Sequence, residues 1–126
     1  MLAPELQSCA AMRVLFVEDQ RVFAETVASQ FLAEHQVDIA ESVAAARTAF
    51  LTEPQYDAAL IDYDLPDGKG TEVVRYLRAG RFRGRIVAVS AKDDGNRELR
   101  AAGAHEVCKK AELHGIGAVL QRLTGR

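Results

Sequence analysis

The chain alternates five times between a short apolar segment and a segment with helical periodicity, and this alternation limits the possible folds more than any other feature. The apolar segments are continuous, which is typical of strands buried on both faces of a parallel sheet. Parallel strands need crossover connections, and these place helices on both faces of the sheet. We therefore predict a doubly wound α/β domain. Its strand segments are expected at residues 14–17, 37–40, 58–61, 86–89 and 107–108.

A segment with helical periodicity follows each strand segment. In the first, Phe23, Val27 and Phe31 recur at positions i, i+4 and i+8, which gives one buried stripe. Ser42 is placed to cap the second helix, and Pro54 follows its end. The helices are expected around residues 23–31, 43–51, 71–78, 96–102 and 116–123.

Glycine and proline mark the boundaries of these elements. Gly103 is expected to cap the C-terminal end of the fourth helix. Residues 65–70, Leu-Pro-Asp-Gly-Lys-Gly, are dense in turn formers and are predicted to be a loop. A length of 126 residues suits one domain. We predict a short N-terminal extension over residues 1–11 and a single domain over residues 12–126.

Composition narrows the classes of function. Hydrophobic residues make up 48% of the chain, enough for a core, and the formal net charge of -2 gives no electrostatic reason to expect nucleic acid or an anionic membrane as a direct partner. The first twelve residues contain no Lys or Arg, and no segment approaches 18 apolar residues, so neither a signal peptide nor a membrane span is expected. Cys9 and Cys108 have no metal-ligand spacing and are expected to be free thiols in a reducing cytoplasm.

Chemically reactive side chains follow four of the five strand segments. Ligands of doubly wound sheets bind at the carboxyl ends of the strands, so we expect these side chains to converge on one site. They are Glu18 and Asp19 after the first strand, Asp62 after the third, Ser90 after the fourth and Lys110 after the fifth.

This set of side chains suits phosphoryl transfer to a carboxylate. Three carboxylates at one rim repel each other by about 4 kcal/mol per close pair at an effective dielectric of about 20. A hard divalent cation such as Mg²⁺ removes that cost. An Asp can then act as a nucleophile towards phosphorus, while a Lys and a hydroxyl group stabilise the charge on the phosphoryl oxygens. Lys109 is an alternative to Lys110, because a one-residue shift of strand register exchanges inward and outward side chains; the spacing from Gly103 favours Lys110.

Together these motifs resemble the receiver domain of two-component response regulators, of the CheY-like type, from Met12 to about Leu123. The resemblance implies a flavodoxin-like (βα)5 fold with strand order 2-1-3-4-5 and helices on both faces. The residues that carry it are Glu18-Asp19, Asp62 in the segment LIDYDLPDGKG, Ser90-Ala91, and Lys110 in the segment GAHEVCKK.

The resemblance also implies roles in metal binding and catalysis. Asp62 would be the phosphoacceptor and, with Asp19, a direct ligand of Mg²⁺. Glu18 would act through a metal-bound water, and the backbone carbonyl of Asp64 would complete the protein ligands. Lys110 would neutralise charge on the phosphoryl group.

The partners implied are a sensor histidine kinase or phosphotransfer protein as phosphodonor, and a downstream protein target or fused output domain. Ser90 would sense the phosphoryl group and shift the surface formed by the fourth helix, fifth strand and fifth helix, through which two copies are also expected to pair. The resemblance implies a signalling module and not a turnover enzyme. The sequence leaves open whether the chain is a stand-alone receiver or part of a longer regulator or hybrid kinase.

Two positions depart from the family's pattern. Val107 stands where the family usually has an aromatic residue, three positions before the conserved Lys. Ala111 replaces the usual proline, and a cis peptide before a non-proline residue costs about 2.5–4 kcal/mol, so we expect the bond between Lys110 and Ala111 to be trans or the loop to be remodelled. Both changes concern the transmission of the signal, which would then depend on Ser90 or on backbone movement.

Asp64 and Lys92 lie two residues after Asp62 and Ser90, respectively, and Ala91 lies between Ser90 and Lys92. Both charged side chains are expected to lean over the entrance of the site. An ion pair between them would hinder the hydrolytic water, which leads to the hypothesis that dephosphorylation is slow.

Two other functions compete with the receiver. The segment Ala59 to Asp64 also fits the D-x-D motif of a haloacid-dehalogenase-type phosphatase, with Asp62 as nucleophile and Asp64 as general acid. The acidic pair that precedes the nucleophile favours the receiver. The changes at Val107 and Ala111 keep a third hypothesis open, a pseudo-receiver that binds partners without phosphorylation.

Overall fold

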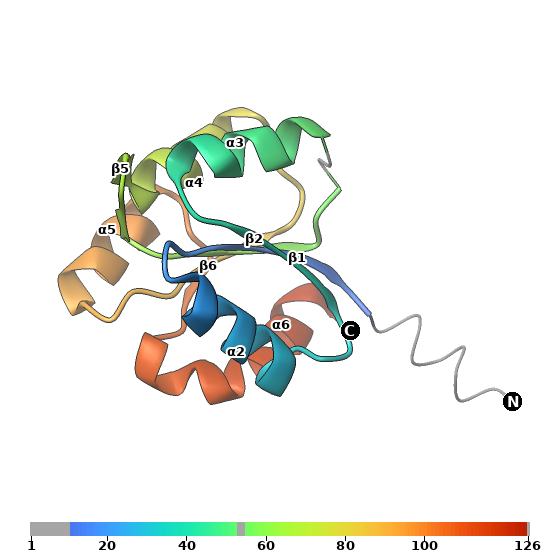
Figure 1. Ribbon diagram of the computed structural model, residues 1–126. Coiled ribbons are helices and arrows are strands. Elements are labelled where there is room, and N and C mark those ends of the chain that lie inside the picture. The colour runs from blue at the N-terminus through green and yellow to red at the C-terminus, as the bar shows by residue number, and fades with distance from the viewer. Residues whose placement is uncertain (1–10, 53–54, 126) are drawn as a thin grey trace, which may run out of the picture.

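A computed structural model describes residues 11–52 and 55–125, which form three layers with a parallel sheet between two layers of helices (Figure 1). The sheet order is β2-β1-β3-β6-β7, and every neighbouring pair is parallel, which confirms the predicted order 2-1-3-4-5. Its strands are β1 (Arg13–Val17), β2 (Gln36–Ala40), β3 (Ala58–Ile61), β6 (Arg85–Ala88) and β7 (Glu106–Val107).

Helices cover both faces of this sheet, as predicted. On one face lie α3 (Val43–Thr52), α4 (Gly70–Ala79) and α5 (Asp93–Ala102). On the other lie α2 (Arg21–Phe31), α6 (Ile116–Thr124) and the short 3-10 helix η1 (Lys110–Gly115). No helix among residues 11–52 and 55–125 is long and apolar enough to cross a membrane.

The central strands contribute to two hydrophobic cores at once. In β1, Leu15 and Val17 belong to the core under α3 and α4, whereas Val14 and Phe16 belong to the core above α2 and α6. All four side chains are fully buried. This is the reason for the continuous apolar runs in the sequence, since a strand covered on both faces has no solvent side.

The strands end in one row. Parallel pairing aligns Val17 with Ile61, Ile61 with Ala88, and Ala88 with Val107. Residues that follow these four positions therefore leave the sheet at the same edge. The register brings together the reactive residues that the sequence places far apart.

The N-terminus of α3, the second helix of the chain, is capped by two side chains. Ser42 Oγ accepts a hydrogen bond from the Ala45 backbone N–H, which confirms the predicted cap. The Asp67 carboxylate also accepts hydrogen bonds from the N–H groups of Val43 and Ala44, and these hydrogen bonds lower the pKa of Asp67. Asp67 thereby ties the loop after β3 to α3. Pro54, expected after this helix, lies outside the described residues.

Some element boundaries differ from the sequence prediction. The sequence predicts a loop over residues 65–70, but most of this segment belongs to a short antiparallel hairpin of β4 (Asp64–Leu65) and β5 (Gly68–Lys69). A tight turn of two residues between β4 and β5 allows this pairing. The fourth helix, α5, begins at Asp93 rather than Asn96. The two aspartates in its first turn stabilise this earlier start, because their negative charges interact favourably with the positive end of the helix dipole. Gly103 ends α5 with a φ of 133°, which confirms the predicted glycine cap.

Tyr56 is buried at the opposite end of the sheet. Its ring packs edge-on against Phe50 at 5.5 Å, and its hydroxyl donates a 2.6 Å hydrogen bond to Asp38 Oδ2. Burial, followed by the hydrogen bond to Asp38, raises the pKa of Tyr56 to about 12.

We expect Tyr56→Phe to lower the free energy of unfolding at pH 7 by about 1 kcal/mol, the usual net contribution of one hydrogen bond. The folded pKa lies above the unfolded value of 10, so this contribution is complete below pH 10 and is lost as the pH rises towards about 12. Urea unfolding should therefore show the difference between the two proteins narrowing over that interval. A difference that stays constant up to pH 12 would contradict this assignment.

Candidate functional site

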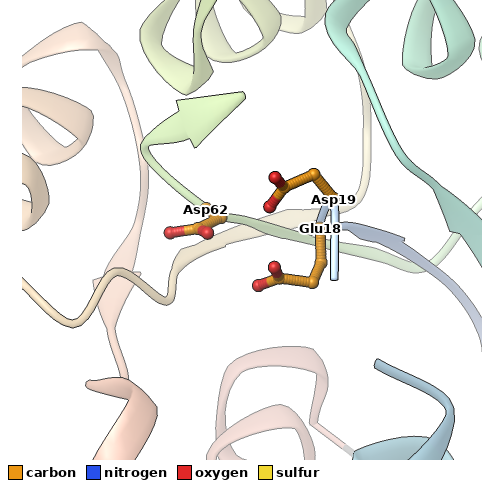
Figure 2. Close-up of side chains that lie close together, drawn as sticks. All are labelled: Glu18, Asp19 and Asp62. Carbon is orange, nitrogen blue, oxygen red and sulfur yellow. The ribbon is translucent and has the colours of Figure 1, made fainter. Parts of the chain in front are cut away.

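Three carboxylates meet at the edge where the strands end (Figure 2). Glu18 and Asp19 follow β1 directly, and Asp62 follows β3, its neighbour in the sheet. One oxygen atom from each of these three side chains lies within 4.8 Å of the others. Glu18 is fully buried and Asp62 is 5% exposed, whereas Asp19 is only half-buried.

Lys110 joins these acids. Its Nζ lies 2.9 Å from Asp62 Oδ2 and 2.9 Å from Glu18 Oε1. Lys109 instead pairs with Asp93 on the surface, at 3.2 Å. Of the two lysines left open by the sequence, the structure therefore brings Lys110 to the acidic cluster. The bond between Lys110 and Ala111 is trans, since no described peptide bond is cis.

The charges at the site depend on each other. Burial raises the pKa of Glu18, although a hydrogen bond from the Gln20 N–H and the nearby ammonium group of Lys110 oppose the shift. Burial alone would lower the pKa of Lys110, but its interactions with the carboxylates of Glu18 and Asp62 outweigh this and raise it. One ammonium group thus contacts two of the three carboxyl groups, and the cluster contains more acidic than basic side chains.

This donor set fits a divalent cation. Glu18 Oε1 is buried and makes no hydrogen bond of acceptable geometry within the described residues, although Lys110 Nζ lies 2.9 Å away. A buried carboxylate oxygen in that condition is unfavourable unless a further cation compensates it. The available ligand atoms are all carboxylate oxygens, which favour Mg²⁺ over softer metals.

Ser90 lies at the end of the neighbouring strand, β6, and is 3% exposed. Its Oγ accepts a 3.0 Å hydrogen bond from the Lys92 backbone N–H. Its backbone is hydrogen-bonded to the side chain of Asn96, a residue that no motif in the sequence marks. Asn96 stands in a polar helical segment, and its burial could not be read from that pattern. The neighbouring Ala91 is exposed.

Asp64 lies outside the acidic cluster and binds two lysines. The expected ion pair with Lys92 is present, with Asp64 Oδ2 at 3.3 Å from Lys92 Nζ. A shorter pair, at 2.7 Å, joins Asp64 Oδ1 to Lys69 Nζ. The hydrogen bond from Lys69 is the main cause that lowers the pKa of Asp64. Lys69 was missed because its partner becomes evident only in the β4–β5 hairpin, where the two residues are directly opposite.

The low pKa of Asp64 bears on the phosphatase hypothesis. A general acid that serves near neutral pH needs a raised pKa, so that it holds a proton to donate. Asp64 is instead held as a carboxylate by Lys69 and Lys92. The geometry therefore argues against Asp64 as the acid of a D-x-D phosphatase.

Two aromatic residues contact the site without having been assigned to it. The Phe23 ring centroid lies 5.2 Å from Lys110 Nζ, a cation–π contact that helps to hold the ammonium group in place. The Tyr63 hydroxyl donates a 2.7 Å hydrogen bond to Glu98 on α5. Val107, at the position that is usually aromatic in receivers, is a half-buried residue packed against the core.

Comparison with known proteins agrees with this geometry. Residues 14–115 match the family described as Response regulator receiver domain, and the chain belongs to this family. It is 33% identical over 119 residues to the virulence transcriptional regulatory protein PhoP of Shigella flexneri and to the transcriptional regulatory protein PhoP of Escherichia coli K12. These matches cover 91% of this chain but 53% of each relative, so the chain spans about half the length of the curated relatives it matches.

Solved structures show the same fold. The receiver domain of the sensor histidine kinase PA1611 from Pseudomonas aeruginosa, which has a magnesium ion coordinated in its active site cleft, is 29% identical with a TM-score of 0.79. That match covers 92% of this chain and 99% of the other. A CheY-like receiver domain from Methylobacillus flagellatus is 28% identical with a TM-score of 0.75, covering 90% of this chain and 98% of the other.

Lys110→Ala should lower the free energy of unfolding of the metal-free protein by about 2 kcal/mol, because it leaves two buried carboxylates without their cation. This value is below the usual cost of breaking a fully buried pair, since the Lys110 side chain is 24% exposed. Lys109→Ala is the matched control, and its surface pair should contribute less than about 1 kcal/mol. Urea unfolding in the presence of a chelator measures both. Equal effects for the two variants would show that the buried pair does not stabilise the fold.

Proposed function

We propose that this chain accepts a phosphoryl group on Asp62 from a phosphohistidine donor, in a reaction that depends on Mg²⁺, and that it acts as a phosphorylation-controlled switch. The observation that carries the proposal is the position of Asp62. Its carboxylate lies at the end of a central strand, within 4.8 Å of the two other acids and 2.9 Å from the ammonium group of Lys110. An Asp that only stabilised the fold would need neither the additional acids nor their excess charge.

The reaction requires one bond to form and one to break. An oxygen of the Asp62 carboxylate attacks phosphorus, the P–N bond of the donor breaks, and the electron pair of that bond remains on the imidazole nitrogen. Asp62 is held for this step, because Oδ1 accepts a 2.7 Å hydrogen bond from the Tyr63 N–H and Oδ2 accepts one from Lys110. That nitrogen takes up one proton from water, so the donor leaves as a neutral imidazole.

The residues around Asp62 stabilise the charge on the transferred group. Lys110 Nζ, 2.9 Å from Asp62 Oδ2, would donate to a phosphoryl oxygen, and the Ser90 hydroxyl would donate to another. Glu18, Asp19 and Asp62, with the backbone carbonyl of Asp64, would hold Mg²⁺. The bound ion would supply charge neutralisation that a single lysine cannot provide.

The partners follow from the same proposal. The donor is a sensor histidine kinase or a phosphotransfer protein, and the phosphorylated domain signals through the surface formed by α5, β7 and α6 to a protein target or a fused output domain. The similarity to two transcriptional regulators, of which this chain covers half, and to a receiver within a sensor kinase supports both arrangements. We place the receiver at residues 12–126 because α6, through Leu120, belongs to its second core.

Intact mass after incubation with phosphoramidate and Mg²⁺ tests the acceptor. We expect the wild type to gain one phosphoryl group and Asp62→Asn to gain none, since the amide nitrogen cannot act as the nucleophile. Omission of Mg²⁺ should abolish the gain. Asp57→Asn, at the opposite end of β3, serves as the matched control. A wild type without any adduct would favour the pseudo-receiver, and continuous release of phosphate from a generic ester would favour the phosphatase.

The lysines bound to Asp64 are proposed to slow hydrolysis of the phosphorylated form by obstructing the approach of water. Lys92→Ala should shorten its lifetime by roughly two- to fivefold, the scale expected of a surface ion pair. Lys69→Ala, which removes the shorter pair, should have an effect at least as large. The phosphorylated fraction is followed by intact mass after the donor is removed. If both lifetimes equal that of the wild type, the obstruction hypothesis is wrong.

A further inference from the structure

We infer that Asn96 is a positioning residue for the acceptor reaction, one that fixes the backbone of Ser90 and so determines where the Ser90 hydroxyl lies at the end of the strand next to that of Asp62. The inference rests on the proposed function and deepens it. Asn96 itself does not touch the phosphoryl group. Its role follows from the contacts of one buried side chain at the start of α5.

The side-chain amide of Asn96 binds both backbone polar groups of Ser90. The Ser90 N–H donates to Asn96 Oδ1 at 2.9 Å, and Asn96 Nδ2 donates to the Ser90 carbonyl at 2.9 Å. Each residue is only 3% exposed, so water does not compete for these hydrogen bonds. A paired donor and acceptor of this kind is what a neighbouring strand would offer, and Asn96 provides it where β6 has ended.

Ser90 needs such a partner because regular strand pairing stops just before it. The preceding residue, Val89, still donates its N–H to the Ile61 carbonyl at 3.0 Å. From the side of β7, the Ser90 carbonyl receives only a long contact from the Lys110 N–H, at 3.5 Å. A buried backbone N–H without an acceptor is strongly unfavourable. Asn96 therefore allows Ser90 to be buried with a defined backbone position.

The fixed backbone leaves the hydroxyl free to donate. Ser90 Oγ accepts the Lys92 N–H, and among the described residues its own hydrogen has no acceptor. A hydroxyl in this condition is ready to donate to an anionic oxygen that arrives at the site. Gly95 allows the close approach of α5, since a Cβ there would lie 3.0 Å from Ser90 Oγ. The first turn of α5 thus contacts Ser90 closely and holds its backbone in position.

Only an amide satisfies both backbone groups of Ser90. Asn96→Asp keeps the size and shape of the side chain but places a second oxygen against the Ser90 carbonyl oxygen, which turns one attractive contact into a repulsive one. Arg97→Ala is the matched control. Arg97 is the next residue of α5, is exposed, and pairs with Asp94 rather than with Ser90.

The deciding experiment is a double-mutant cycle on the rate of phosphoryl uptake from phosphoramidate and Mg²⁺, followed by intact mass. We expect Asn96→Asp and Ser90→Ala each to slow uptake by about tenfold, the scale of one lost charge-assisted hydrogen bond. The double variant should be no slower than Ser90→Ala alone, because Asn96 acts only through Ser90. Arg97→Ala should match the wild type. The Mg²⁺ concentration that gives half the maximal rate should be unchanged in Asn96→Asp, which a general loss of structure would not preserve.

Several results would overturn the inference: an Asn96→Asp rate equal to that of the wild type, or a double variant slowed by the product of the two single effects. A wild type that takes up no phosphoryl group refutes the proposed function instead. Amide hydrogen exchange of the wild type gives a second test, which needs no variant. It tests the hydrogen bond between the Ser90 N–H and Asn96 even if Asn96→Asp does not fold. The Ser90 amide hydrogen should exchange as slowly as the amides of β6, and exchange at the rate of an exposed loop would contradict the inference.

Discussion

The functional edge of this protein depends on the register of its parallel strands. Val17, Ile61, Ala88 and Val107 lie in one row, so the residues that follow them emerge together. A shift of one residue in any of these pairs would turn the following side chain to the other face of the sheet. The two hydrophobic cores prevent such a shift, because it would move the apolar side chains of a strand from one core to the other face of the sheet. Packing far from the site therefore determines the position of its chemistry.

The same edge concentrates negative charge, and this charge has to be compensated. Glu18 is fully buried beside Asp62, and burial raises its pKa. Lys110 compensates part of the charge and is itself supported by the ring of Phe23. A site of this kind costs stability when it contains no cation, which is typical of residues retained for function rather than for folding. The acceptor proposal accounts for the excess of acid, whereas a purely structural role does not.

The sequence was sufficient for the fold because each strand is short, apolar and followed by a helical pattern. It also indicated which edge of the sheet carries the candidate groups, because they follow strand ends, where the fold class predicts a site. It was not sufficient for contacts made by residues whose partners come from another element. The capping of α3 by Asp67, the pairing of Lys69 with Asp64 and the binding of Ser90 by Asn96 all depend on how loops cross the edge of the sheet. No periodicity in the chain encodes those crossings.

The helix α5 is connected to Asp62 and to Ser90, and this bears on the missing aromatic residue at position 107. Tyr63 provides one connection. Its N–H donates a hydrogen bond to Asp62 Oδ1, and its hydroxyl donates one to Glu98 on α5. Gly95 lies against both Tyr63 and Ser90, where a Cβ would be 2.9 Å from the Tyr63 ring and 3.0 Å from the Ser90 hydroxyl oxygen. A displacement of the Asp62 carboxylate or of Ser90 would therefore act on α5, in addition to Lys110, whose Nζ lies 2.9 Å from Asp62 Oδ2. The side chain of Val107 is not needed for such a route, since both connections bypass β7.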